Sequence, residues 1–389
     1  MANTNIASLA PMIIAKAHKV LRKRLAILTN VNKDYAMIPK GKDETIPVSV
    51  PTDFGTAGNA SAAAYFDPPD HTNVTRNLAL TSWKEKGFYL TDQEIAKIAT
   101  EVGYVPNQLE AAAEAIARAI AADGWATYKG VYGLVGSAGT TPFGSTTDVA
   151  VDAGSLLDDQ FCPTEDRTLL VNSAAKANVL KLDAFKSFDK RGDLSPLRDA
   201  NMGRFLGLDW FLDQAVPLHT RGTLAGTPLV NGAVAIGATT MNIDAGALTG
   251  TVVPGDIFTV AGDPQQYVAT NTTTAAANAI TGITFSPASV LGFADNAAVT
   301  FVATHRVNLA FNKNAIYFGS RILAGDDTGL LGNVGNAIFE EKMEDPVTGV
   351  VLRLSVTRQK YRVVWNLDCL YGWLLARPEL AVRVAGAST

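Results

Sequence analysis

A glycine-rich stretch with one serine is the first place in this sequence where the residue types suggest chemistry. GVYGLVGSAG spans residues 130–139 and places Ser137 between Gly136 and Gly139. A phosphate-binding loop follows a strand and carries a lysine, whereas this stretch follows a predicted helix and has none. A hydrolase nucleophile elbow needs the pattern GxSxG, which Val135 breaks. We interpret the stretch as a flexible exit from the helix, with a hydrolase or ligand-binding enzyme as the alternative hypothesis.

The other residue types that bind metals or perform catalysis are scattered. His18, His71, His219 and His305 show no HExxH or HxxxH spacing, so each is predicted to be a surface or loop histidine. The acid pairs in LLDDQF and AGDDTG do not follow the calcium-loop pattern and indicate turns or helix caps. The aromatic residues of WNLDCLYGW favour core or interface packing over a ligand box. We therefore expect no enzyme activity, no metal and no cofactor.

The composition describes a folded chain with few charges. Its 389 residues are 47% hydrophobic, which leaves room for two or three domains with a buried core. Charged residues make up only 18%, against roughly 25% in ordinary soluble domains. The electrostatic repulsion between copies of the chain is therefore weak. Extensive burial of its surface against partners is plausible. The net charge of -4 and the pI near 5.6 argue against a general nucleic-acid binder.

Neither export nor membrane anchoring is predicted. IASLAPMIIA precedes KAHKVLRKR, which reverses the order of a secretory signal. The most apolar stretch, residues 363–386, is interrupted by Asp368, Arg377, Glu379 and Arg383. Cys162 and Cys369 lack CxxC spacing and are expected to be buried, reduced thiols of an intracellular product. A disulfide between them stays an open alternative at this point.

Residues 8–30 have the pattern of an amphipathic helix. Apolar residues recur at steps of three and four, while a basic set falls largely on the other side: Lys16, Lys19, Arg22, Lys23 and Arg24. One reading is an arm that contacts nucleic acid or another acidic surface. The other, which the pattern alone favours, is a solvated helix face.

Residues 44–90 indicate a long hairpin. ETIPVSVP is a predicted strand, TDFGTAGNASAAAYFDPPDHTN is a turn-rich tip, and VTRNLALTSWKEKGFYL returns as strand. A compact domain rarely keeps so long a structureless tip, and a two-stranded hairpin alone is marginal in water. We therefore expect something outside its own domain to steady the hairpin.

Further along, local signals place helices and strands. TDQE at 91–94 is a capping box, and the longest helical run follows Pro106, with Leu109, Ala113, Ile116 and Ile120 as its buried stripe. TLLV predicts a buried strand before a helix capped at Asn172 or Ser173. Near the end, Leu352, Leu354 and Val356 share one strand face. The apolar residues then change from even to odd positions, and the next shared face is formed by Tyr361, Val363, Trp365 and Leu367. A bulge or tight turn is therefore expected near Gln359 and Lys360.

The clearest compositional boundary encloses residues 222–304. No Lys, Arg or Glu occurs between Arg221 and Arg306, and strand-like runs there alternate with Gly, Asn, Asp and Pro turns. This pattern predicts a small all-β barrel or sandwich inserted into a parent domain of mixed α and β structure.

Taken in order, several segments resemble tailed-bacteriophage major capsid proteins. The order and spacing of the segments carry this resemblance, which covers most of the chain outside the β insertion: PMIIAKAHKVLRKRLAILTNVNKDY, DETIPVSVPTDF, FYLTDQE, CPTEDRTLLVNSAAKANVL, LGLDWFLDQAVPLHT, VNLAFNKNAIYFGSRIL and LYGWLLARPELAVRVAG. The resemblance is to the Hong Kong 97-type coat fold, in the branch whose prototype is a Salmonella podovirus coat with an inserted β-barrel.

The resemblance implies an α+β fold with named regions. They are an N-terminal arm (1–43), an extended hairpin loop (44–83), a peripheral domain (84–165) with a spine helix at about 105–131, an axial domain with returning peripheral strands (166–221 and 305–389), and the inserted β-domain (222–304). It also implies inter-subunit contacts through the hairpin loop, for which the candidates are Phe54, Tyr65, Phe66 and Trp83, and a DNA-facing or inter-subunit arm at Lys19, Arg22, Lys23 and Arg24.

The function that the resemblance implies is an icosahedral shell around double-stranded DNA. Its partners would be other copies in hexamers and pentamers, a portal, a decoration protein, packaged DNA bound non-specifically, and no membrane. Its location would be the virion capsid, assembled in the host bacterial cytoplasm. Some relatives carry a long helical leader as an internal scaffold, which this chain lacks, so a separate scaffolding protein and a procapsid that matures by expansion are expected. An encapsulin-like compartment with protein cargo is the alternative.

Overall fold

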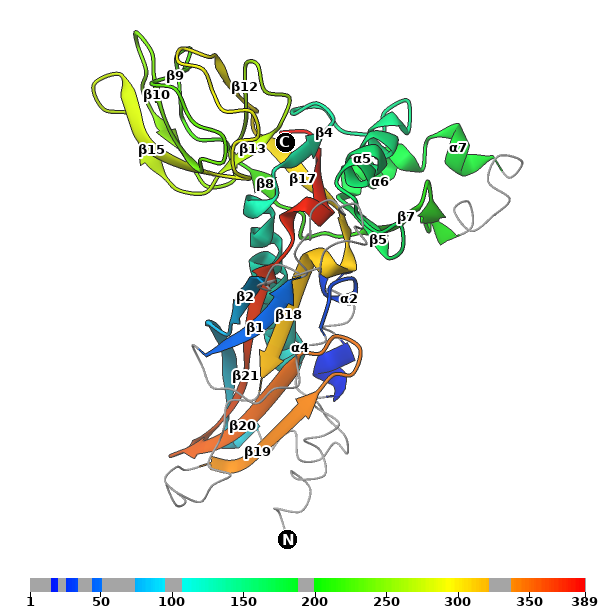
Figure 1. The fold of residues 1–389 in the computed structure, drawn as a ribbon. Helices are drawn as coiled ribbons and strands as arrows, with labels where there is room; N and C mark the ends of the chain where they lie inside the picture. Colours follow the sequence, from blue (N-terminus) through cyan, green and yellow to red (C-terminus); the bar gives the residue numbers. More distant parts are fainter. Residues whose placement is uncertain are drawn as a thin grey trace, which may run out of the picture.

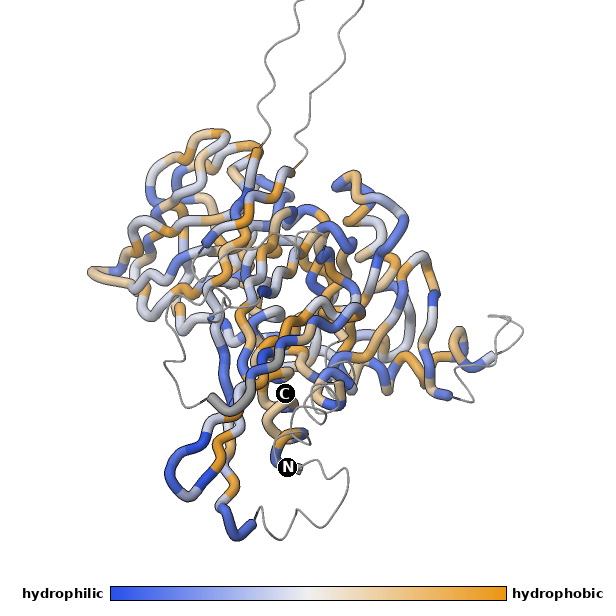
Figure 2. Tube along the Cα trace, turned by 90° about the horizontal axis from the view of Figure 1, so that it is seen from below, coloured by the Kyte–Doolittle hydropathy of each residue, from blue (hydrophilic) through white to orange (hydrophobic). Residues whose placement is uncertain are grey.

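The computed structural model describes residues 15–19, 26–33, 44–50, 74–94, 107–187, 199–321 and 337–388. These residues form a mixed α and β structure. Figure 1 shows a long sheet at one end, while helices α5–α7 and a separate group of strands (β9–β16) lie on opposite flanks of the other end. The hydropathy tube in Figure 2 shows hydrophobic residues recurring between hydrophilic ones throughout the molecule, as packed strands and helices require.

The long sheet is organised around one strand. β21 (Arg362–Leu375) pairs along one edge with β3 (Ser82–Thr91) and along the other with β20 (Val351–Gln359) and then β18 (Ile316–Arg321). β19 (Ala337–Glu344) pairs with β20. Every neighbouring pair in this sheet is antiparallel. Segments from three distant parts of the chain therefore meet on β21.

The predicted turn between β20 and β21 is confirmed. Leu352, Leu354 and Val356 are buried on one face, and Gln359 pairs with Arg362. Only two residues then link the strands, and Lys360 takes a φ of 53° as such tight turns require. Tyr361 lies in this turn and is 73% exposed, so its predicted place beside Val363 was wrong.

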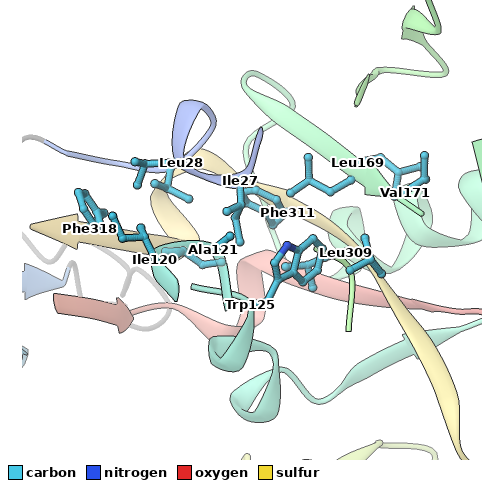
Figure 3. Close-up of a cluster of buried hydrophobic side chains, with 14 of the residues drawn as sticks. Ile27, Leu28, Ile120, Ala121, Trp125, Leu169, Val171, Leu309, Phe311 and Phe318 are labelled. Atoms are coloured by element: carbon cyan, nitrogen blue, oxygen red, sulfur yellow. The ribbon is translucent and has the colours of Figure 1, made fainter. Parts of the chain in front are cut away.

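The longest helix covers one face of this sheet. α4 (Asn107–Trp125) buries Leu109, Ala113, Ile116 and Ile120, as its periodicity predicted. It continues as the short helix η1 (Ala126–Gly130). Figure 3 shows α4 side chains, among them Ile120 and Trp125, meeting Ile27 and Leu28 from α2 (Ala26–Thr29) and Phe318 from β18. A single core therefore joins α2, α4 and the sheets.

A seven-stranded sheet forms the other half of the body. Its order is β4 (Gly133–Val135), β22 (Ala381–Ala385), β17 (His305–Asn312), β5 (Arg167–Val171), β7 (Leu208–Leu212) and β6 (Gly203–Phe205), with β8 (Leu218–His219) also paired to β17. The chain reaches β22 from β21 through the short 3-10 helix η3 (Pro378–Leu380), which begins at a proline.

Three helices accompany this sheet: α5 (Asp148–Asp159), α6 (Ser173–Val179) and α7 (Asp183–Lys186). The cap of α6 is Asn172, whose side chain accepts from the N–H of Ala175 at 3.0 Å. The capping box at Thr91 also forms, because the backbone N–H of Thr91 donates to Glu94 at 2.8 Å. Residues 95–106, which follow this box, lie outside the described residues.

Between Leu229 and Phe301 the chain forms short strands around their own core. A six-stranded sheet runs in the order β16 (Val299–Phe301), β12 (Ile257–Val260), β13 (Tyr267–Ala269), β15 (Ala279–Ser286), β10 (Thr240–Asp244) and β9 (Leu229–Val230). β11 (Thr251–Val252) and β14 (Thr273–Thr274) form a separate pair. A bridge between Leu229 and Ala298 joins the two edges of the six-stranded sheet, so we call β9–β16 the barrel. Phe258, Tyr267, Phe285 and Phe293 pack inside it.

The barrel meets the body at an edge strand. The Gln266 side chain accepts from the Leu134 N–H at 2.6 Å and donates to the Leu134 carbonyl at 2.9 Å. One amide side chain thus satisfies both backbone groups on the free side of β4. Tyr132, Leu134, Ile257 and Val268 form the apolar part of this junction.

The hairpin of β1 (Thr45–Val50) and β2 (Val74–Ala79) crosses β21 at a glycine. The two strands pair in register from Thr45–Ala79 to Val50–Val74. A Cβ on Gly372 would overlap the carbonyl oxygen of Ala79. The close crossing of backbones therefore requires a residue without a side chain here.

Gly372→Ala is expected to lower the free energy of unfolding by about 1–3 kcal/mol, because backbone atoms must move to admit the methyl group. Gly154→Ala is the matched control, since nothing lies within 4 Å of a Cβ at this position in α5. The control should gain up to about 1 kcal/mol from helix propensity. Urea unfolding of both variants as unassembled subunits measures the difference, and equal effects would contradict the close crossing.

Candidate functional site

The glycine-rich stretch carries no catalytic neighbours. Ser137 is exposed in the turn between Gly136 and Gly139, both of which have a positive φ. The stretch follows α4 and η1, as predicted, and contains the short strand β4 before this turn. Among the hydrogen bonds of the described residues, the Ser137 hydroxyl has none to a histidine or an acid. The geometry therefore gives no support to a serine nucleophile.

The histidine predictions were wrong for every histidine that the structure describes. His18 and His219 are 3% exposed and His305 is fully buried, whereas surface or loop positions were expected; His71 lies outside the described residues. Each buried ring has a polar partner: His18 Nε2 lies 3.2 Å from the Met343 carbonyl, and His305 Nδ1 donates to the Ala303 carbonyl at 2.7 Å. These hydrogen bonds offset part of the free-energy cost of burying the polar rings.

His219 lies at the centre of a buried polar cluster. Its Nε2 donates to Asp256 Oδ1 at 3.0 Å, and its Nδ1 accepts from the Tyr128 hydroxyl at 3.1 Å. Asp256 also accepts from the backbone N–H groups of Gly222 and Val253, at 3.2 and 2.9 Å. Asp256 comes from the barrel, whereas Tyr128 and His219 come from η1 and β8 of the body. The cluster therefore spans the junction.

This hydroxyl, imidazole and carboxylate order resembles a catalytic relay, but the cluster is sealed. Tyr128, His219 and Asp256 are 6%, 3% and 1% exposed, so no substrate reaches the hydroxyl. Burial also raises the pKa of Tyr128, which disfavours the phenolate nucleophile. The arrangement instead fixes the barrel to the body by hydrogen bonds with defined directions.

Arg383 completes the junction. Its guanidinium is fully buried, donates to the Gly255 carbonyl at 2.8 Å and lies over the Tyr128 ring at 5.0 Å. Burial lowers the pKa of Arg383 to about 9. Burial, with Arg383 and His219 nearby, lowers the pKa of His305 to about 4, so this histidine is neutral at pH 7.

The two cysteines are separate, buried thiols, as expected; no disulfide joins Cys162 and Cys369. Burial raises the pKa of both thiols. The described ranges hold no group of three or more His, Cys, Asp or Glu side chains placed to bind a metal. No helix in the same ranges is long and apolar enough to cross a membrane.

Of the four residues predicted to face DNA or another subunit, the structure describes one, Lys19. Lys19 is exposed at the end of the helical residues 15–19, while Arg22, Lys23 and Arg24 lie outside the described residues. On the same short helix, Lys16 pairs with Glu110 of α4 at 2.6 Å. The ion pair ties this part of the chain to the long helix.

Of the predicted hairpin contacts, Trp83 alone is described; Phe54, Tyr65 and Phe66 lie outside the described residues. Trp83 is 46% exposed on the edge strand β3, and its Nε1 donates to Asp368 Oδ2 at 2.8 Å. Arg353 holds the same carboxylate at 2.9 and 2.6 Å. The indole is therefore held in place on a partly open surface, where it can meet another protein.

The β1–β2 hairpin packs on the body only at its base. Ile46, Val48 and Leu78 are buried there against Leu370. Beyond the base, Ser49, Thr75 and Val74 are exposed, and Val74 shows 46% of its surface. Among the described residues nothing covers this outer part, although a two-stranded hairpin alone is marginally stable.

Comparisons with known proteins give matches among solved structures. No family model and no curated protein matches the chain. The structure titled "Mycobacterium phage Che8" is 16% identical over 91% of this chain and 88% of that chain, with a TM-score of 0.47. "Capsid structure of the Cyanophage P-SCSP1u" is 13% identical over 93% and 87%, with a TM-score of 0.48. "Crystal structure of virus-like particle from Pyrococcus furiosus" is 8% identical over 96% and 97%, with a TM-score of 0.42. With TM-scores below 0.5, the function has to be argued from this chain's own residues.

The buried histidine predicts a pH dependence of stability. The pKa of His305 is about 4 in the folded chain and about 6.5 when unfolded, so only the unfolded state takes up the proton between these values. Its contribution to stability is complete above about pH 6.5 and is lost as pH falls towards 4, at up to about 1.4 kcal/mol per pH unit.

His305→Asn keeps a donor towards the Ala303 carbonyl but does not titrate. In urea unfolding between pH 7.5 and 4.5, the variant should lose less stability than the natural chain. Other titrating groups contribute equally to both proteins and cancel in the difference. If the free energies of unfolding of the two proteins fell in parallel with pH, His305 would not be held neutral in the folded chain.

Proposed function

We propose that this chain is a shell-forming structural protein, the major capsid protein of a tailed bacteriophage. The observation that carries the proposal is the β1–β2 hairpin, which is buried at its base and which no described residue covers at Ser49, Val74 and Thr75. An element of this kind is stabilised when a neighbouring subunit covers it. The ordered sequence segments that resemble phage coat proteins support the same conclusion.

A closed shell suits the other properties of the chain. Shell contacts are heterologous, so each subunit needs several different surfaces at once. The low charged fraction of 18% reduces repulsion between closely packed copies. Many modest contacts hold each subunit, while single errors still dissociate during assembly. The sealed cluster at His219 and the isolated Ser137 fit a structural role without catalysis.

The finer features of the proposal follow the sequence resemblance. They are the Hong Kong 97-type organisation, with the barrel as an inserted domain, and a shell of hexamers and pentamers around double-stranded DNA. A scaffolding protein, portal and decoration protein would be its partners in the host cytoplasm. Expansion of a procapsid would need an element with two stable positions, for which the hairpin, the N-terminal arm and the spine helix α4 are the candidates.

Electron microscopy tests the proposal directly. The purified chain, with a co-expressed scaffolding protein where needed, is expected to form hollow closed particles. Particles from infected cells should contain double-stranded DNA, whereas an enzyme cargo would favour the encapsulin-like alternative. A chain that stays monomeric under every assembly condition would overturn the proposal.

Val74→Asp is expected to block particle formation, because a carboxylate on the uncovered hairpin strand would be buried unpaired against a neighbour. Val74→Thr keeps the branched shape without charge and should assemble nearly as well as the natural chain. Sedimentation velocity gives the assembled fraction. The two variants should unfold at similar temperatures as subunits, because the side chain is 46% exposed there. Equal assembled fractions for the two variants would show that the hairpin is not part of the interface.

Replacing Lys19, Arg22, Lys23 and Arg24 together by Gln should make DNA binding less dependent on salt. Each lost phosphate contact lowers the slope of log K against log salt by about 0.9. Fluorescence anisotropy of a labelled duplex across a KCl series measures this slope. Lys16→Gln is the control, since Lys16 is already paired with Glu110. An unchanged slope in the fourfold variant would favour a solvated helix face.

A further inference from the structure

Phe161 is an aromatic side chain presented to solvent. It lies just beyond the end of α5 and is 94% exposed. Its φ of 55° is a left-handed conformation that a bulky residue adopts only at a cost. In an isolated subunit the exposed ring gains no burial that would offset the strain of its backbone, which indicates that it is used in a contact.

The turn below Phe161 is held rigidly. The backbone N–H of Phe161 donates to the Asp158 carbonyl at 2.9 Å. Arg167, which is 6% exposed, donates to Asp158 Oδ1 at 2.7 Å, to the Cys162 carbonyl at 2.5 Å and to the Pro163 carbonyl at 2.8 Å. A backbone fixed in this way does not have to be ordered on binding, so only the two side-chain torsions of Phe161 lose freedom.

One charge accompanies this anchor. Asp158 is already paired with Arg167. Asp159 is exposed, and the described residues supply no ion-pair partner for it. The projecting feature therefore combines an aromatic ring with an available carboxylate, and its receptor should be an apolar pocket with a cation at its rim.

The barrel has a pocket of this chemistry where its sheet closes. The pocket has a volume of about 300 Å³ and includes Pro228, Leu229, Val299 and Phe301 in its lining. Arg221 is the single charged residue of that lining. It donates to the Leu224 carbonyl at 2.6 Å, while its Nε is buried without a hydrogen-bond partner in the described structure. A guanidinium here can meet both a carboxylate and a ring face.

We propose that Phe161 of one subunit inserts into this pocket of a second copy of the chain, with Asp159 beside Arg221. Phe161 is 94% exposed, so it does not fill the pocket of its own chain. The contact is heterologous, because Phe161 follows α5 whereas the pocket is lined by barrel residues. Figure 1 shows α5 and the barrel on opposite flanks of the molecule. Repetition of such a contact links subunits head to tail, and a rotation that closes gives a ring. The inference rests on the proposed shell function and names one of its contacts.

Disulfide trapping tests the contact. In a Phe161→Cys, Thr227→Cys variant, the two new thiols should be oxidised to an inter-subunit disulfide by diamide, which is reduced in turn. Because each copy carries both cysteines, a ladder of dimers and larger multimers is expected on a non-reducing gel. The natural Cys162 and Cys369 are 5% and 3% exposed and should not react. Phe161→Cys with Val290→Cys is the matched control, since Val290 is a barrel residue that is 52% exposed.

The outcomes separate this inference from the proposed function. Particles with a ladder support both, while particles without a ladder overturn the Phe161 contact and leave the shell intact. Absence of particles from the natural chain contradicts the shell, whereas their absence from the Phe161→Cys variants alone reflects the lost ring. In either case the ladder in concentrated soluble protein still decides the contact.

A charge exchange gives an independent measurement. Asp159→Arg and Arg221→Glu should each raise the concentration needed for assembly by roughly tenfold, and the double variant should recover most of that loss. Phe161→Ala should raise it by tenfold or more, because a buried aromatic anchor is lost, and Phe161→Leu by less. Thermal unfolding of each subunit checks that the fold is kept. Additive losses in the charge pair, or normal assembly of Phe161→Ala, would overturn the contact.

Discussion

The structure depends on the continuity of β21, a strand of 14 residues that holds together segments from distant parts of the chain. β3 lies along one edge, while β20 and β18 share the other. The hairpin β1–β2 crosses the strand at Gly372, and Trp373 meets Gly124 of α4. Closing these long loops is costly in entropy, so the pairing must form as one cooperative unit. A break in β21 would therefore separate the hairpin, the helix and the sheet together.

The junction with the barrel solves a different problem, that of orientation. An apolar seam alone tolerates sliding, since dispersion contacts have little direction. The Tyr128, His219 and Asp256 hydrogen bonds allow one alignment only, and Arg383 adds a bond to Gly255. The cost is the burial of charged groups, which the bonds must offset. A residue set that resembles a catalytic relay thus serves alignment, as its exposure of 6% or less shows.

Local features of the fold could be predicted from the sequence because their causes are local. The stripe of α4, the Asn172 cap, the Thr91–Glu94 box and the turn at Lys360 each depend on neighbouring residues. The buried histidines could not be predicted, because His219 meets Asp256 across 37 positions and two sheets. Phe161 was missed for a related reason: a non-glycine residue gives no local signal of a positive φ, and exposure depends on packing. Of the hairpin candidates, only Trp83 can be placed.

In the shell proposed for this chain, the Gln266 amide that caps Leu134 would have a consequence for the packing of many copies. An open strand edge attracts any other strand, and crowding many copies together multiplies such encounters. By occupying both backbone groups of β4 with a side chain from its own barrel, the subunit withdraws this edge from indiscriminate pairing. Association at this edge then has to rely on shaped side-chain surfaces. Such contacts discriminate between right and wrong neighbours, and misplaced copies can leave before a mistake becomes permanent.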